Sequence, residues 1–232
     1  MKKFFMAAVG MALMACTNTL NSNAEEITNT RPIGKYTGID AGQGIQVNVV
    51  AGDGDSLTVK APADIIDKII TEVKGDVLII HWDKKTNIKS PRHIEVTVPM
   101  RAVNQIKASS GATVNTDTIR GNNLIFRSSS GAHINTMVEA LSVSAKSSSG
   151  ASMKIIGKTG NAEYEASSGA HISADKLQSA DVYAEASSGA SISVSTGSGL
   201  KASASSGGHI KYSGSPTMVN ISSSSGGSIS KL

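Results

Sequence analysis

Residues 148–153 read Ser-Ser-Gly-Ala-Ser-Met, and this phrase, Ser-Ser-Gly-(Ala or Gly)-polar-apolar, occurs seven times in the chain of 232 residues. Its glycines are Gly111, Gly131, Gly150, Gly169, Gly189, Gly207 and Gly226, separated by 20, 19, 19, 20, 18 and 19 residues. A near-constant period is typical of repeat proteins, in which each unit buries its apolar face against the next. The phrase therefore predicts a stack of similar units over residues 101–232.

The residues around each glycine alternate between apolar and polar side chains, as in half-buried strands. Mostly apolar or small residues stand seven, five and three positions before the glycine and three positions after it. Mostly charged or hydroxyl side chains stand four positions before it: Lys107, Arg127, Lys146, Glu165, Glu185, Ser203 and Ser222. Each glycine falls between two strands, where it tolerates a positive φ angle and close backbone approach.

Two short strands and two turns in each repeat describe one coil of a β-solenoid, with coils stacked about 4.8 Å apart. We therefore predict an all-β protein, a parallel β-helix-like solenoid of about seven coils at residues 101–232. The alternative is a β-sandwich of many short strands. The strict repetition of the glycine phrase favours the solenoid.

The residues before the repeats lack the phrase and are expected to form an N-terminal β-rich cap at 32–100, over one open end of the solenoid. Within it, residues 63–71 fit one or two helical turns, and residues 73–82 fit a hairpin. Residues 25–31 are polar without periodicity and are expected to form a tether. At the other end no polar capping repeat follows Ile229, so either backbone solvation suffices or the coils associate end to end.

The first 24 residues have the pattern of a signal peptide. Lys2 and Lys3 precede an apolar stretch, residues 4–15, that is too short to span a membrane. Two cleavage sites fit: before Cys16, where residues 13–16 resemble a bacterial lipobox whose cysteine is lipidated, or after Ala24. The chain is therefore expected to be an outer-membrane lipoprotein facing the periplasm or the surface, or a secreted protein.

Composition argues against nucleic acid as a partner. Loss of Lys2 and Lys3 with the signal peptide lowers the formal net charge from +4 to +2, since residues 1–24 contain no acidic residue. Aromatic residues make up 3% of the chain, and no basic stripe is interleaved with them. The single cysteine excludes an intramolecular disulfide.

The repeats, together with Gly44-Ile45-Gln46-Val47, residues 72–80 and Val96-Thr97-Val98-Pro99, resemble the head-GIN domain family of putative autotransporter adhesins. The resemblance covers about residues 32–232. It implies an all-β, solenoid-like exported domain, secreted or lipid-anchored, without catalytic residues. No membrane barrel of alternating strands follows the repeats in this sequence, so self-translocation is not expected.

Three groups of side chains are candidates for a site. One outward row lies two residues after the glycines, where His133, His171 and His209 alternate with Ser152 and Ser191. Coils stack about 4.8 Å apart, so successive histidines are two coils apart and too distant to share a zinc ion. Glu163, Glu165 and Glu185 form a carboxylate patch for a cation or for catalysis, or else a solvated charge ladder beside Lys146. The paired serines form hydroxyl rows suited to turns or to binding a polymer.

A basic loop with Lys84, Lys85, Lys89 and Arg92 fits contact with anionic lipid or simple solvation. No catalytic residue, resident metal or cofactor is predicted. We expect a non-enzymatic cell-envelope protein, an adhesin-like binding or structural module with an unidentified protein, glycan or lipid partner, held at the membrane only by a lipid anchor. The alternatives are a lipid- or glycan-binding protein with its ligand between cap and coils, and a carbohydrate-active enzyme that uses the carboxylate patch.

Overall fold

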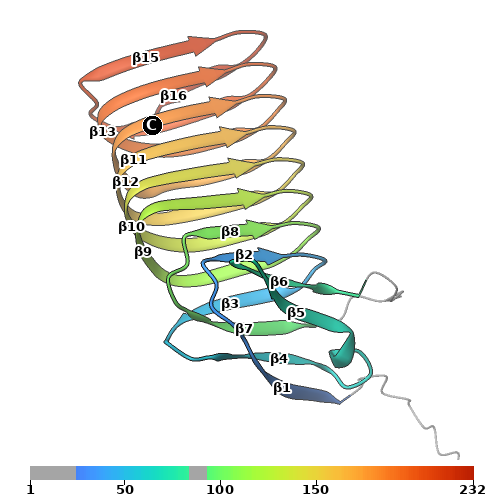
Figure 1. The fold of residues 1–232 in the computed structure, drawn as a ribbon. Helices are drawn as coiled ribbons and strands as arrows, with labels where there is room; N and C mark the ends of the chain where they lie inside the picture. The colour runs from blue at the N-terminus through green and yellow to red at the C-terminus, as the bar shows by residue number, and fades with distance from the viewer. Residues whose placement is uncertain (1–24, 84–92) are drawn as a thin grey trace, which may run out of the picture.

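The computed structural model describes residues 25–83 and 93–232, which form one continuous 16-stranded sheet folded into a stack of coils (Figure 1). Five strands of 14 to 16 residues bend in the middle, so each contributes to two layers of the stack: β9 (Thr113–Ser128), β10 (His133–Ser147), β11 (Ser152–Ala166), β12 (His171–Ala186) and β13 (Ser191–Ala204). The predicted all-β fold with a parallel β-solenoid of about seven turns is confirmed.

The upstream layer holds the strands that precede the tight turns. It consists of β5 (Ile69–Lys74), β6 (Val77–Trp82), β2 (Gly38–Ala41), β8 (Gln105–Ala108), the second halves of β9 to β13, and β15 (Met218–Ser223). All neighbours in this layer are parallel except β5 and β6, which form an antiparallel hairpin at its N-terminal end. A short 3-10 helix, η1 (Ile66–Lys68), precedes the hairpin.

The downstream layer holds the strands that follow the turns. It consists of β1 (Glu26–Pro32), β4 (Ser56–Pro62), β7 (Glu95–Met100), β3 (Gln46–Ala51), the first halves of β9 to β13, β14 (His209–Gly214) and β16 (Ser228–Lys231). Antiparallel β1 and β4 close its N-terminal end, because β4 pairs with both β1 and β7.

The tight turns have the backbone geometry that the repeated phrase predicts. In the third turn both central residues have positive φ, 53° at Ser149 and 69° at Gly150, and the Ala151 amide donates to the Ser148 carbonyl at 3.1 Å. Positive φ at both central residues is typical of a type I′ turn, in which glycine removes the steric cost at one of the two positions. The same pair of positive φ angles recurs in all seven phrases.

An eighth turn of this kind lies in the region that the sequence assigns to the cap. Gln43 and Gly44 have φ of 60° and 72°, and the Gly44 amide donates to the Ser110 carbonyl at 2.9 Å, as Gly111 does to Ser130 at 3.0 Å. β2 and β3 therefore form a further coil, with β6 and β7 in register below it. Because β3 pairs directly with β9, the coil stack begins before residue 101, and the cap consists of the antiparallel strands at its end.

Residues 25–31, expected to be a tether, lie almost entirely within strand β1, which pairs with β4 along its whole length from Glu26 to Pro32. Most of its side chains are exposed, so this edge strand shows no hydrophobic alternation in the sequence. Arg31 attaches it to the hairpin, since its guanidinium donates to the carbonyl oxygens of Ile69 at 2.5 Å and Ile66 at 2.8 Å. Burial lowers the pKa of Arg31 from its ordinary value.

The interior of the coils is filled by the inward-facing rows. Phe126 and Tyr164 occupy the same row on alternate coils, 1% and 0% exposed, with Ala145 between them. Large and small side chains therefore interdigitate along the stack, as close packing requires. Inside the turns, Ser128 and Ser147 share a buried hydrogen bond of 2.8 Å.

Candidate functional site

An open groove of about 410 Å³ runs along the upstream layer beside the tight turns, across the coils from β8 to β12. One wall is the charged row, defined as Asp40, Lys107, Arg127, Lys146, Glu165 and Glu185, of which the last five line the groove. The other wall consists of serines of the turns: Ser129, Ser148, Ser167 and Ser187. The groove lies along the stack of coils, whereas the lipid- or glycan-binding alternative from the sequence placed the ligand between cap and coils.

The charged row changes sign along its length. Three cations on adjacent strands, Lys107, Arg127 and Lys146, are followed by two carboxylates, Glu165 and Glu185. The two lysines have partners, since Lys107 lies 2.8 Å from Asp40 and Lys146 lies 2.6 Å from Glu165. The hydrogen bond to Glu165 is the largest cause of a raised pKa at Lys146. The part of the row that lines the groove is therefore dipolar, positive toward β8 and negative toward β12.

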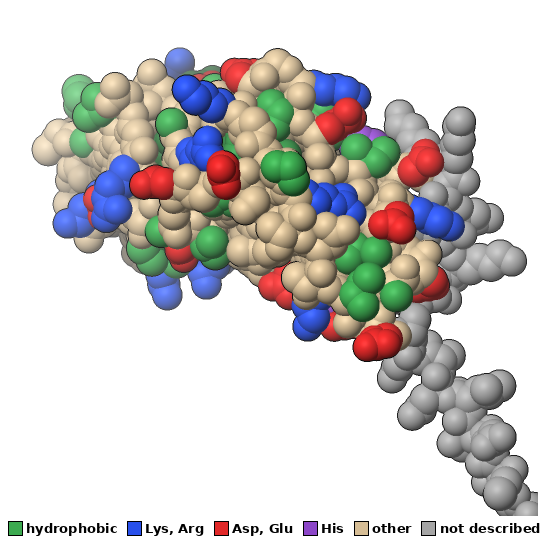
Figure 2. Space-filling view, turned by 60° about the horizontal axis from the view of Figure 1, so that its bottom comes forward, with side chains coloured by type: hydrophobic (Ala, Val, Ile, Leu, Met, Phe, Trp, Pro, Cys, Tyr) green, Lys and Arg blue, Asp and Glu red, His purple; other side chains and the backbone are tan. Residues whose placement is uncertain are grey.

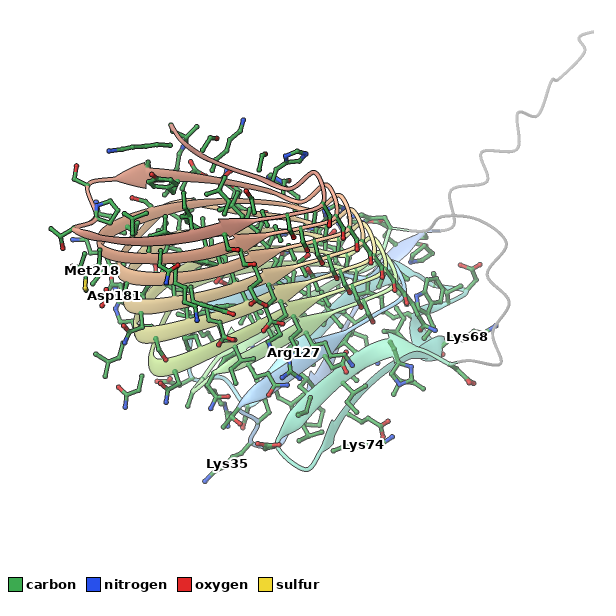
Figure 3. All side chains as sticks on the ribbon, turned by 90° about the horizontal axis from the view of Figure 1, so that it is seen from above. Lys35, Lys68, Lys74, Arg127, Asp181 and Met218 are labelled. Carbon is green, nitrogen blue, oxygen red and sulfur yellow. The ribbon has the colours of Figure 1, made fainter. Side chains whose placement is uncertain are left out.

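Arg127 differs from its two neighbours. It lies on the broad upstream face, between the edge that carries Asp181 and Met218 and the opposite edge of tight turns (Figure 3). Within residues 25–83 and 93–232, no hydrogen bond or ion pair involves its guanidinium. The sequence places Arg127 in the row but gives no sign that it is unpaired. Whether Arg127 has a partner depends on which cations Asp40 and Glu165 contact.

The carboxylate patch comes together as an ordinary ladder. Glu165 pairs in register with Glu185, and Glu163 pairs with Tyr183. The Tyr183 hydroxyl donates to Glu185, and this hydrogen bond is the largest cause of the raised pKa of Tyr183. Lys201 lies 5.1 Å from the centre of the Tyr183 ring. In the described ranges, no group of three or more His, Cys, Asp or Glu residues is arranged to hold a metal ion.

The histidine row lies on the downstream layer, away from the groove. The register places His133, Ser152, His171, Ser191 and His209 on successive strands. Each histidine Nδ1 forms a hydrogen bond with the serine Oγ of the following coil, at 2.6 Å for His133 with Ser152 and 2.5 Å for His171 with Ser191. The serine between two histidines thus separates them and occupies a ring nitrogen of one of them.

An asparagine ladder on the same layer was not anticipated. Asn135 donates to Asn115 at 2.9 Å, Asn115 donates to Asn48 at 3.2 Å, and Asn48 donates to Glu95 at 2.5 Å. These contacts use up side-chain hydrogen-bonding groups within the ladder. The signal in the sequence was the asparagine four residues after Gly44, Gly111 and Gly131.

On the face seen in Figure 2, basic, acidic and hydrophobic side chains are interspersed over a surface that is mostly tan. Cys16 and the basic loop with Lys84, Lys85, Lys89 and Arg92 lie outside the described residues. None of the helical segments in the described ranges has the length and hydropathy needed to cross a membrane.

Comparison of the sequence with protein-family models shows the family of the chain. The family model described as "Putative auto-transporter adhesin, head GIN domain" matches residues 35–216. The chain belongs to this family. The match extends from just before β2 to just beyond β14, so it includes the groove and both rows of side chains. No curated protein matches the chain.

Solved structures share the head GIN fold at low sequence identity. A putative adhesin from Bacteroides fragilis is 20% identical with a TM-score of 0.83, covering 90% of this chain and 97% of that one. A protein from Parabacteroides distasonis described as a putative lipid binding protein is 16% identical with a TM-score of 0.71, covering 90% and 98%. A putative adhesin from Parabacteroides merdae is 16% identical with a TM-score of 0.73, covering 90% and 97%. At these identities the likeness shows the fold.

Proposed function

We propose that the protein is a non-enzymatic adhesin-type module of the cell envelope that binds a polar, extended ligand, a glycan, in the upstream groove. The observation that carries this proposal is the groove itself, with charged side chains from five successive coils on one wall and turn serines from four of them on the other. A regular row of donors and acceptors about 4.8 Å apart suits a linear polymer with repeating hydroxyl groups.

A polar ligand fits this groove better than a lipid tail. An acyl chain needs an apolar cavity, whereas the groove is lined by charged and hydroxyl side chains together with Ala166. The interior of the coils is filled, since Phe126 and Tyr164 are fully buried there. The likeness to a protein named as lipid-binding therefore supports a binding role, and the lining of the groove favours glycan over lipid as its ligand.

The partners of the carboxylates support binding rather than catalysis. Glycoside hydrolysis uses two carboxyl groups with separate acid and base or nucleophile roles. Here Glu165 is engaged by Lys146 and Glu185 by the Tyr183 hydroxyl. Release of reducing ends from glycans by the wild-type protein, abolished by Glu165→Gln, would establish the enzyme alternative instead.

Export and anchoring form the second part of the proposal. The basic and apolar segments of residues 2–15 and the position of Cys16 support export as a lipoprotein, and the adhesin description of the family supports a place at the cell envelope. Cell fractionation tests the anchor: wild type is expected with the membranes, and Cys16→Ser is expected to lose that association. Equal membrane retention of both proteins would reject lipidation at Cys16.

A glycan array probed with two variants tests the groove. Ser148→Trp places an indole on the groove wall, and Ser193→Trp places the same group on the outer face of the downstream layer. We expect binding of wild type and Ser193→Trp, and loss of at least tenfold in Ser148→Trp. Binding that survives in Ser148→Trp would locate the ligand elsewhere, and binding of no glycan by wild type would reject the glycan assignment.

A further inference from the structure

Arg127 carries the uncompensated positive charge of the groove. Lys107 and Lys146 flank it in register, and each of them has its own carboxylate partner, Asp40 or Glu165. We propose that Arg127 is an anion-recognition residue, and that the groove selects acidic glycans whose carboxylate or sulfate group lies against its guanidinium. This inference rests on the proposed function and specifies the class of ligand.

Without a bound ligand, the arrangement of charges around Arg127 is unfavourable for the folded state. Like charges on adjacent strands repel one another, and three cations lie side by side here. Asp40 and Glu165 offset the charges of the outer two and leave the central one. An anion bound at Arg127 relieves this repulsion, so the local field favours a negatively charged ligand over a neutral one.

The chemistry of the side chain matches an oxyanion. A guanidinium presents a planar fork of N–H donors that binds carboxylate or sulfate through two parallel hydrogen bonds. Ser129 and Ser148 line the same groove, at the turns that follow Arg127 and Lys146, and add hydroxyl groups that both donate and accept. Together they offer an acidic sugar a charge contact for its anion and hydrogen bonds for its hydroxyl groups.

The opposite end of the groove limits how much charge the ligand carries. Glu165 and Glu185 lie on the two strands beyond Lys146, and among the described residues Glu185 has no cation as a hydrogen-bonding partner. Carboxylates accept hydrogen bonds from neutral sugar hydroxyls and repel a second anion. The groove therefore fits a glycan in which acidic and neutral sugars alternate better than one that is charged at every sugar.

Isothermal titration with defined hexasaccharides tests this inference. The alternating acidic probe is hyaluronan, in which an acidic and a neutral sugar alternate. The probes that carry an anion on every sugar are chondroitin sulfate and oligogalacturonate, and the neutral probe is N-acetyl-chitohexaose. We expect wild type to bind an alternating acidic probe at least tenfold more tightly than the neutral one. Raising the ionic strength is expected to weaken that binding, because the contact is exposed to solvent.

Three variants separate Arg127 from general electrostatics. Arg127→Gln is expected to lose at least tenfold in affinity for the acidic probe, and Arg127→Lys to fall between Gln and wild type, since it keeps the charge but not the fork. Lys154→Gln removes one positive charge from the outer row of the downstream layer and is expected to bind as wild type does.

Failure of this inference is distinguishable from failure of the proposed function. Loss of binding in Ser148→Trp shows that the groove is the site. If, in addition, neutral and acidic probes bind wild type equally, or Arg127→Gln binds the acidic probe as wild type does, the anion assignment is wrong. If no acidic probe binds at all, the anion assignment is likewise wrong. If Ser148→Trp binds every probe as wild type does, the groove itself is rejected.

Discussion

Lys146 donates a 2.6 Å hydrogen bond to Glu165 on the next coil, and the charged row changes sign between these two residues. The contact is exposed, with 42% and 38% of the two side chains accessible, so we expect Lys146→Gln to lower the free energy of unfolding by less than about 1 kcal/mol at pH 7. Since the folded-state pKa of Lys146 is raised, this contribution is complete below the unfolded pKa of about 10.4 and is lost as the pH rises through the folded value.

Urea denaturation of both proteins at pH 7 and at pH 11.5 measures this difference. The gap between wild type and Lys146→Gln is expected to shrink at the higher pH. A gap that stays constant or widens there would show that the ion pair does not stabilise the folded chain.

Gly150 and Gly157 are expected to respond differently to alanine. Both have positive φ, 69° and 124°, but a Cβ at Gly150 meets nothing within 4 Å, whereas at Gly157 it would lie 2.0 Å from the Val138 carbonyl oxygen. We expect Gly150→Ala to cost about 1–2 kcal/mol from backbone strain, and Gly157→Ala to cost distinctly more because the coils must separate.

Gly34 is the matched control for these two glycines, because it has neither a positive φ nor a neighbour within 4 Å of an added Cβ. Thermal denaturation of the three alanine variants should rank Gly34, Gly150 and Gly157 in order of increasing loss. Equal losses at Gly150 and Gly157 would contradict the close approach of the coils at Gly157.

Tyr164 lies in the filled interior, and its hydroxyl makes no hydrogen bond in the described part of the chain. Burying a polar group without a partner is costly, so Tyr164→Phe is expected to leave stability unchanged or to raise it by up to about 1–3 kcal/mol. Tyr164→Ala, in contrast, is expected to lose about 3–5 kcal/mol through the cavity it creates. A clear loss of stability in Tyr164→Phe would reveal a hydrogen bond to the hydroxyl.

Alkaline pH provides a second test of the same residue. Burial raises the pKa of Tyr164 in the folded protein. The free energy of unfolding is therefore unaffected by this group below the unfolded pKa of about 10, and it falls as the pH rises from there toward the folded value. Absorbance of tyrosinate should show Tyr164 ionising only together with unfolding. Its ionisation in the folded protein near pH 10 would contradict the burial.

Arg31 joins the edge strand β1 to the hairpin region through the carbonyl oxygens of Ile66 and Ile69. Because hydrogen bonds from charged groups are worth about 1.5–3 kcal/mol, we expect Arg31→Ala to destabilise the N-terminal end by roughly that amount. Hydrogen exchange should rise in β1 and β5 first. The control is Arg120→Ala, which breaks an exposed pair with Glu139 and should cost less than about 1 kcal/mol.

The coils were predictable because one local constraint repeats. A turn with two positive φ angles favours glycine and small polar residues, and the alternation on either side defines the inward face, so the phrase marks both the turn and the strands. Register then places residues at equal distances from their glycines on neighbouring strands, as for Glu165 and Glu185.

The N-terminal end was less predictable because its elements do not follow the phrase. The turn at Gln43–Gly44 lacks the serine pair, and the exposed side chains of β1 leave no hydrophobic period. The order of strands is also non-sequential, since β2 and β3 lie between the coil of β6 and β7 and the coil of β8 and β9. The groove was missed for a similar reason. Its walls are built from residues of five coils, and which of the charged side chains pair with one another depends on contacts between coils that the sequence does not show.

Chemical-shift mapping by NMR, with the protein titrated by an alternating acidic hexasaccharide, shows directly which surface binds. The groove predicts shifts at the turn serines and in the second halves of β9, β10 and β11, with the Arg127 side-chain Nε–H signal among the most affected. Shifts confined to the histidine row of the downstream layer or to β15 and β16 would contradict the groove as the binding surface.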